Sequence, residues 1–217
     1  MVRRILLGLS VAAALLGAWV AKDWAGHARH SLRDFDPHEV ARLETRMWRS
    51  YYAHRSFRLF ADLVTLLREQ YHLPFWRACA GAYHAARAAA VFQRGHDRAE
   101  YSRALPDLVS YYQLIDAAST ERLPVPEVSA DELEWWIVHR QRSVHQPGDL
   151  ARALAVEQAA VFQQPEADFT AHGSARAEAM DLCDAGNAHG GATEAEWAQI
   201  HSALDRAWSA LRSAVNR

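Results

Sequence analysis

The chain has 217 residues, of which 50% are hydrophobic and 23% are charged. This balance excludes a disordered chain, a coiled-coil rod and a collagen-like fibre, and it is sufficient for a hydrophobic core. The formal net charge is −2, so the chain has no overall basic field and we expect no nucleic-acid partner. The two cysteines, Cys79 and Cys183, are too few for a disulfide framework or a cysteine-rich zinc site.

An uncharged apolar segment covers residues 5–21, close to the N-terminus. Arg3 and Arg4 precede this segment, and Lys22 closes it. At about 1.5 Å of rise per residue, a helix of this length is at the short end of what spans the hydrocarbon core of a bilayer. The sequence therefore predicts a membrane anchor in residues 1–22, which contacts the membrane through residues 5–21.

Two other interpretations of this segment stay open. A cleaved signal peptide has the same basic start, but its apolar region is usually shorter, and bulky Trp19 stands where a cut after Ala21 requires a small side chain. A buried helix of a soluble domain has a similar composition. For an anchor, Trp19 and Trp24 lie where interfacial tryptophans are expected, and Arg3 and Arg4 favour a cytoplasmic N-terminus with a periplasmic or other extracytoplasmic body.

The rest of the chain shows helical signals throughout. Residues 23–35 are polar and predict a juxtamembrane linker, and residues 36–217 predict one all-α, bundle-like domain of about seven helices behind the N-terminal hydrophobic helix. No segment shows the period-two alternation of a strand. Pro106 interrupts or kinks one helix, and a capping box at Ser129 opens another after a loop over residues 119–128. The predicted helices cover residues 37–54, 57–71, 74–93, 97–117, 129–142, 149–164, 166–185 and a last segment after Thr193.

Two carboxylates lie on otherwise apolar helix faces. Glu44 shares its face with Val40, and Glu157 has a similar apolar setting. A charged group in such a place is costly unless it is paired, hydrogen-bonded or bound to a metal. Arg140 lies on the apolar face of another segment, and tyrosine hydroxyls are close in sequence. The sequence therefore predicts a buried polar network of Glu44, Tyr51, Arg140 and Glu157.

The same acids support an alternative, which is a redox enzyme with a metal centre built from carboxylates and histidine. Ferritin-like di-iron proteins take single glutamates from two helices and a Glu-x-x-His pair from each of two others. This chain contains one such pair, at residues 69–72, near a predicted helix end. In this alternative Fe or Mn is held by Glu44, His84, Glu134 and Glu157.

A second alternative is a haem- or quinone-binding helical protein. Small residues, mostly alanine, surround His84 in the segment 78–90. A flat cofactor needs a close-packed slot and often an axial histidine. Small residues serve the close packing of helices equally well, so this pattern has two explanations.

Arginine alternates with aromatic residues over residues 46–58. Acidic residues nearby reduce any basic patch, which argues against nucleic acid and favours a solvated face. In a membrane-tethered chain, the same stretch can contact anionic lipid headgroups.

Signature motifs of several enzyme classes are missing from the sequence. The chain has no Gly-x-Gly-x-x-Gly or Walker loop, no Gly-x-Ser-x-Gly and no His-Glu-x-x-His. We therefore expect a membrane-tethered, all-helical domain that serves as a non-catalytic binding or scaffold protein, with no cofactor and with an unidentified protein partner.

Overall fold

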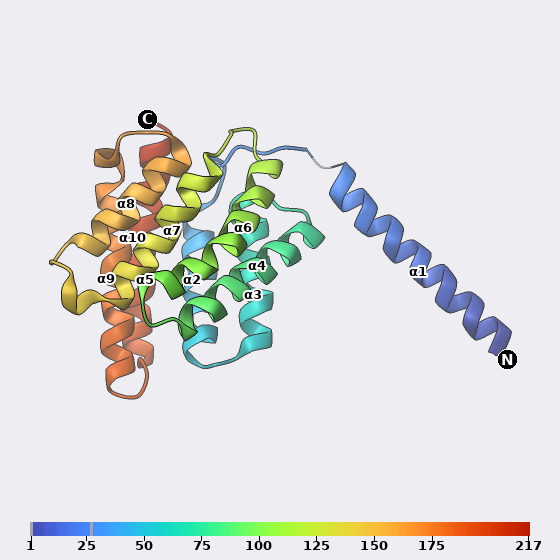
Figure 1. Cartoon of the computed structure of the whole chain (residues 1–217), viewed down its shortest axis with the longest axis horizontal. Coiled ribbons are helices and arrows are strands. Elements are labelled where there is room, and N and C mark those ends of the chain that lie inside the picture. Colours follow the sequence, from blue (N-terminus) through green and yellow to red (C-terminus); the bar gives the residue numbers. More distant parts are fainter. Residues whose placement is uncertain (1, 27) are drawn as a thin grey trace.

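The computed structural model describes residues 2–26 and 28–217, and the prediction of an all-α fold is confirmed over this part of the chain (Figure 1). Eight helices of 14 residues or more form the body, where the sequence predicts about seven. The helices are α1 (Val2–Ala25), α2 (Pro37–Tyr52), α3 (Ser56–Tyr71), α4 (Phe75–Arg94), α5 (Arg98–Tyr101), α6 (Leu105–Ala118), α7 (Val125–Arg140), α8 (Asp149–Phe162), α9 (Thr170–Ala188) and α10 (Glu194–Val215). Three 3₁₀ turns cover Ser102–Ala104, Arg142–Val144 and Glu166–Phe169.

Local signals decide where several helices begin. Asp36 caps α2, because its carboxylate accepts hydrogen bonds from the backbone N–H groups of His38 and Glu39. Thr193 and Glu196 form a reciprocal capping box at the start of α10. Each cap satisfies N–H groups that have no partner inside the helix.

The predicted interruption at Pro106 is confirmed, and one predicted helix start is wrong. The segment 97–117 is divided into α5, a 3₁₀ turn and α6, because Pro106 in the first turn of α6 lacks the N–H that a continuous helix needs. Helix α7 begins at Val125, inside the predicted loop over residues 119–128, since proline is favoured in a first helical turn. Ser129 therefore lies inside α7 and donates to the carbonyl of Val125 at 2.6 Å instead of capping a helix.

Consecutive helices pack against one another, and the last helix returns to the first helix of the body. Contacts lead from α2 through α3, α4, α6, α7 and α8 to α9, and α10 packs against both α9 and α2. The main hydrophobic core collects side chains from all of these helices. Each helix buries an apolar face against its neighbours, which is what makes the body a single packed unit.

The segment that precedes α2 also belongs to the packed body. Leu32 and Phe35 are buried, and the carboxylate of Glu121 accepts a hydrogen bond from the backbone N–H of Leu32 at 3.0 Å. The predicted linker covers residues 23–35. Its second half is thus packed on the body by two apolar side chains, although the rest of the stretch is polar.

Helix α1 leaves the body and runs alone (Figure 1). None of the stretch Leu6–Ala25 is buried, and Leu7 and Leu15 are 68% and 67% exposed. By length and composition the helix is a candidate membrane span, and a signal sequence has the same features. The structure contradicts the interpretation as a buried helix of a soluble domain, because its large apolar side chains are exposed, and even Trp19, which contacts Phe75 of α4, is 48% exposed.

Helices α8 and α9 approach each other most closely at Gly173. A Cβ atom at this position would lie 2.1 Å from the backbone carbonyl oxygen of Ala151 in α8. Glycine lowers helix propensity, so its presence inside α9 reflects the space that this crossing leaves.

We expect Gly173→Ala to lower the free energy of unfolding by about 3 kcal/mol, because the backbone of α8 must move away from the added methyl group. Urea denaturation measures the change. Ser174→Ala is the matched control, since Ser174 is the exposed neighbour on the same helix, and it should change stability by less than about 0.5 kcal/mol. Equal stability of the two variants would contradict the close crossing.

Candidate functional site

Four charged side chains from four helices come together inside the body. They are Glu44 of α2, Glu132 of α7, Glu157 of α8 and Arg176 of α9, and we call them the acid–arginine cluster. Glu44 and Glu157 are 1% and 3% exposed, so the predicted burial of these two acids is confirmed. Glu44, Glu132 and Glu157 all attract the guanidinium of Arg176 electrostatically.

Arg176 and Glu44 form the ion pair of the cluster. Arg176 donates from Nη2 to Oε1 of Glu44 at 2.9 Å, and Nε1 of Trp208 donates to the other carboxylate oxygen at 2.6 Å. The guanidinium also lies over the rings of Trp135 and Trp208, at 5.4 and 5.9 Å from their centroids. Burial by itself lowers the pKa of Arg176, but the attraction of the three acids outweighs burial and raises the pKa, so the group stays charged.

Glu132 receives three hydrogen-bond donors. The hydroxyl of Tyr112 donates to it at 2.9 Å, and the indole N–H groups of Trp135 and Trp136 donate at 3.0 and 2.9 Å. An ionised carboxylate is an acceptor only, and several N–H or O–H donors stabilise this form. The geometry therefore places the negative charge of this half of the cluster on Glu132.

Glu157 shares the same tyrosine hydroxyl with Glu132. Its Oε1 lies 3.1 Å from the Tyr112 oxygen, and Nε2 of Gln158 donates to its Oε2 at 2.5 Å. A phenol has one hydrogen, and burial together with the charge of Glu132 raises the pKa of Tyr112 well above its ordinary value, so that hydrogen is retained. Only one carboxyl group can accept it.

When Tyr112 donates its hydrogen to Glu132, its contact with Glu157 is a hydrogen bond only if Glu157 carries a hydrogen. Burial, followed by the charge of Glu132, raises the pKa of Glu157 to about 8, which agrees with this hydrogen count. Burial and the charge of Glu132 thus favour the neutral form of Glu157, and in this form Glu157 can donate to Tyr112 while Tyr112 donates to Glu132. The cluster then holds two negative charges, one positive charge and one shared proton.

The carboxyl groups of the cluster are occupied by protein donors, whereas Nε of Arg176 is buried without a hydrogen-bond partner among the described residues. Including Tyr112 and Trp208, the network connects α2, α6, α7, α8, α9 and α10. Chemically it can hold a proton on Glu157, but the carboxylates already accept hydrogen bonds from protein donors. This arrangement fixes helices relative to one another.

The prediction that Arg140 and Tyr51 belong to the buried network is wrong. Arg140 is the exposed last residue of α7, and its only described hydrogen bond reaches the carbonyl of Gln93 at 3.5 Å. Tyr51 is 43% exposed, and its hydroxyl accepts from Nε2 of Gln93 at 2.9 Å. The apolar stripe of α7 does end at Arg140, but the core does not extend that far along the helix.

The four predicted metal ligands do not converge. Nδ1 of His84 lies 2.9 Å from Oδ1 of Asp107, and Glu134 forms a two-pronged ion pair with Arg98 at 2.7 and 2.9 Å. The other two predicted ligands belong to the acid–arginine cluster. Within residues 2–26 and 28–217 no group of three His, Cys, Asp or Glu side chains could hold a metal ion.

The small residues around His84 serve helix packing. Helices α3 and α6 both pack on α4, and a Cβ added at Gly81 would lie 3.1 Å from Cδ1 of Leu67. The space that the haem or quinone interpretation needs on this face is thus taken up by neighbouring helices.

Two members of the cluster were not predicted from the sequence. Arg176 lies in a segment rich in small residues, which shows no clear apolar stripe, and Glu132 lies in the capping box that the sequence predicts at Ser129. A usable signal for Glu132 is the position of Trp135 and Trp136 three and four residues later, because residues at this spacing share a helix face with it. Sequence alone holds no comparable signal for Arg176.

His172 is a further buried polar residue that the sequence did not single out. Its Nδ1–H donates to the carbonyl of Ala207 at 2.9 Å, and its ring lies edge-on to Trp208. Burial, with the nearby charge of Arg176, lowers the pKa of His172 to about 3. The imidazole is therefore neutral at physiological pH and adds no charge to the core.

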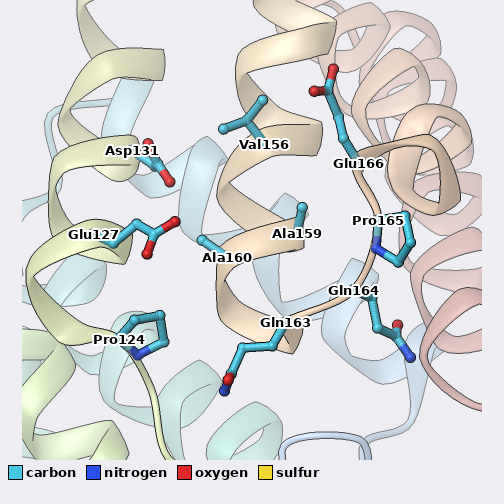
Figure 2. A pocket seen from close by; sticks show the side chains of 10 residues that line it. All are labelled: Pro124, Glu127, Asp131, Val156, Ala159, Ala160, Gln163, Gln164, Pro165 and Glu166. Carbon is cyan, nitrogen blue, oxygen red and sulfur yellow. The ribbon is translucent and has the colours of Figure 1, made fainter.

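A surface hollow of about 460 Å³ lies between α7 and α8, apart from the acid–arginine cluster (Figure 2). Figure 2 shows Glu127 and Asp131 reaching from α7 toward α8, where Val156 and Ala160 form the facing wall. Burial, followed by the charge of Glu127, raises the pKa of Asp131. The hollow is acidic and open to solvent. None of the cluster's carboxyl groups lines it, so a substrate bound there would not contact them.

Comparison of the chain with protein-family models, with curated proteins and with solved structures finds no match. The function is therefore argued from the geometry of this structure.

We expect Glu44→Leu to lower the free energy of unfolding by about 3–5 kcal/mol, because it leaves the charge of Arg176 buried without its carboxylate. The double variant Glu44→Leu/Arg176→Met should recover part of this loss, so the two effects are not additive. Chemical denaturation of the wild type, the single variants and the double variant measures the coupling. Arg140→Leu is the control and should be nearly neutral, whereas additive effects would count against the pair.

The proton on Glu157 makes stability depend on pH. The folded state keeps this proton up to about pH 8, whereas an unfolded glutamate releases it near pH 4.3. Between these values the folded state binds more protons than the unfolded state, so its stability falls as pH rises. Below about pH 6.5 this effect is offset by His172, which stays neutral in the folded state with a pKa of about 3 but gains a proton when unfolded. We therefore expect Tm to decrease from about pH 7 to about pH 9, and Glu157→Gln, which stays neutral, to reduce that decrease.

Thermal melts of the two proteins across this range test the assignment of the proton. Glu127→Gln is the matched control, because Glu127 is an exposed acid, and its melts should follow the wild type. A Glu157→Gln variant that loses stability as steeply as the wild type would show that the proton resides elsewhere.

Proposed function

We propose that the chain is a membrane-tethered helical protein whose body binds or scaffolds a protein partner and performs no chemistry of its own. The observation that carries the first half is α1, a 24-residue helix whose large apolar side chains are exposed. Apolar surface in water costs roughly 25 cal/mol per Å². A bilayer removes this cost, and the flanking tryptophans suit its interfaces.

The contact between α1 and the body favours an anchor that is retained. Trp19 stacks on Phe75 with ring centroids 5.5 Å apart, and the carboxylate of Asp23 accepts the backbone N–H of Trp76 at 2.5 Å. Helix α4 has no side-chain cap of its own, so Asp23 supplies one from α1. Cleavage after Ala21 would remove the stacked ring.

The acid–arginine cluster supports the second half of the proposal. Its carboxyl groups are the candidates for a general acid or base in the body, and their hydrogen-bond and ion-pair partners are other protein side chains. A general acid or base must reach the atom whose proton it transfers. Burial of Glu44 and Glu157 keeps these groups from a bound substrate, which favours a role in binding over catalysis.

The orientation in the membrane follows from the N-terminal arginines. Arg3 and Arg4 favour a cytoplasmic N-terminus and an extracytoplasmic body. Lys22 and Arg29 follow the apolar stretch and weaken this bias, so orientation is tested separately from anchoring.

We expect the full-length protein to remain with membranes after an alkaline carbonate wash. Leu9→Arg/Leu16→Arg should release it, because an arginine in the middle of a span costs about 2.5–3.5 kcal/mol on insertion scales. Leu9→Ile/Leu16→Ile keeps the segment apolar and should behave as the wild type. A full-length protein found wholly in the soluble fraction would refute the anchor.

Two further readouts use the same membranes. The intact mass of the purified protein distinguishes a retained anchor from a cleaved signal. Protease added to the extracytoplasmic side should digest the body, and complete protection would reverse the proposed orientation while leaving the anchor intact.

A further inference from the structure

Charge is unevenly distributed along the body. Residues 55–94, which form α3, α4 and their turn, contain six arginines and two acidic residues. Residues 95–217 contain ten arginines and 19 acidic residues. We call the first segment the α3–α4 hairpin. Residues 28–54 contain five arginines and four acidic residues. The α3–α4 hairpin is therefore the most basic part of a body that is acidic overall, and α1 contacts it through α4.

The exposed surface of the α3–α4 hairpin keeps the positive balance of its sequence. Asp62, one of its two acids, is buried and lies 2.7 Å from Arg46 of α2. Glu69 is the other acid. Five of the six arginines are exposed, and these are Arg55, Arg58, Arg68, Arg87 and Arg94.

Solvent-exposed aromatic side chains lie among these arginines. Phe57 is 96% exposed at the start of α3, Tyr83 of α4 is 52% exposed and Phe60 is 39% exposed. Phe57 has the highest exposure of the large apolar side chains in the described part of the chain. An apolar ring flanked by arginines suits an interface that offers both negative charge and an apolar layer.

The direction of α1 places this surface toward the membrane. From its contact with α4, α1 runs toward the lower right of the view, and the turn between α2 and α3 lies in the lower part of the view, as does the turn between α9 and α10 (Figure 1). The hydrogen bond between Asp23 and Trp76 and the stacking of Trp19 on Phe75 join the two helices directly. A bilayer crossed by α1 therefore lies on the side of the body that carries Phe57.

We infer that the α3–α4 hairpin is a second membrane contact, which lies against the anionic headgroups of the bilayer that α1 spans. This inference rests on the proposed anchor. Exposed arginines attract the negative lipid surface, Phe57 reaches its apolar layer, and the acidic remainder of the body is held away from it. The occupant is lipid, because α1 brings this face to a bilayer whether or not another macromolecule is present.

The test is a nitroxide label at Ala61→Cys in the full chain, with Cys79 and Cys183 replaced by alanine. Ala61 is exposed on α3, one helical turn after Phe57. The chain is reconstituted in phosphatidylcholine vesicles with about 30% phosphatidylglycerol, near the charge of a natural anionic leaflet. We expect the label to be accessible to oxygen and protected from a water-soluble nickel chelate. Neutral vesicles or high salt should weaken this protection, because both reduce the attraction between charges.

Two controls separate lipid contact from general burial. A label at Val144→Cys, on the turn between α7 and α8, should remain open to nickel, since Val144 is 74% exposed in the acidic part of the body. Arg58→Glu/Arg68→Glu should reduce the protection at position 61 by about fivefold or more. Arg152→Glu/Arg206→Glu reverses two other exposed arginines and should leave the protection unchanged.

Carbonate extraction of the same vesicles distinguishes the two proposals. If the chain stays in the vesicles but position 61 is open to nickel in both lipids, the hairpin does not contact the membrane and the anchor stands. If the chain is extracted, the anchor fails, and the hairpin contact fails with it. Equal protection in the two charge-reversed variants would also overturn the inference, since the arginines would then not be responsible.

Discussion

The interior of the body holds three carboxyl groups against one guanidinium, and this imbalance of charge constrains the packing around it. A buried carboxylate without partners is too costly for a domain of ordinary stability. The structure meets the constraint in three ways: Arg176 pairs with Glu44, two indoles and a phenol hold the charge of Glu132, and Glu157 keeps its proton. If any of these were lost, an unpaired group would remain in a place that water does not reach.

The same constraint explains why tryptophan is used in this core. Trp135, Trp136 and Trp208 bury large apolar rings and also supply N–H donors to the carboxylates of Glu44 and Glu132. Phenylalanine would also bury an aromatic ring but would leave those oxygens without partners. Because the donors and acceptors come from six helices, a shift of one helix along another would break several hydrogen bonds at once. The polar network therefore selects one register among packings that apolar contacts alone would tolerate.

Periodicity and the capping signals at Asp36 and Thr193 predicted the helices well, because each depends on residues close in sequence, whereas the capping box predicted at Ser129 is not formed. The burial of Glu44 and Glu157 could be predicted for the same reason, since each lies on the apolar stripe of its own helix. The partner could not be predicted this way: Arg140 lies on an equally good stripe, but α7 ends where the core ends, and Arg176 reaches the core from a helix without a clear stripe. Pairing depends on how helices cross, as at Gly173, and a crossing is decided by side chains far apart in the chain.

The direct contacts between α1 and α4 matter because they hold a rigid body in a fixed position relative to α1. The attraction of one arginine to an anionic membrane is only about 1 kcal/mol, and it would be lost to motion if the body hung on a flexible tether. Asp23 caps α4 and Trp19 stacks on Phe75, so α1 is joined to the basic α3–α4 hairpin itself. Insertion of α1 then brings that face to the lipid at high effective concentration. Several weak attractions can act together on a body that is already in place.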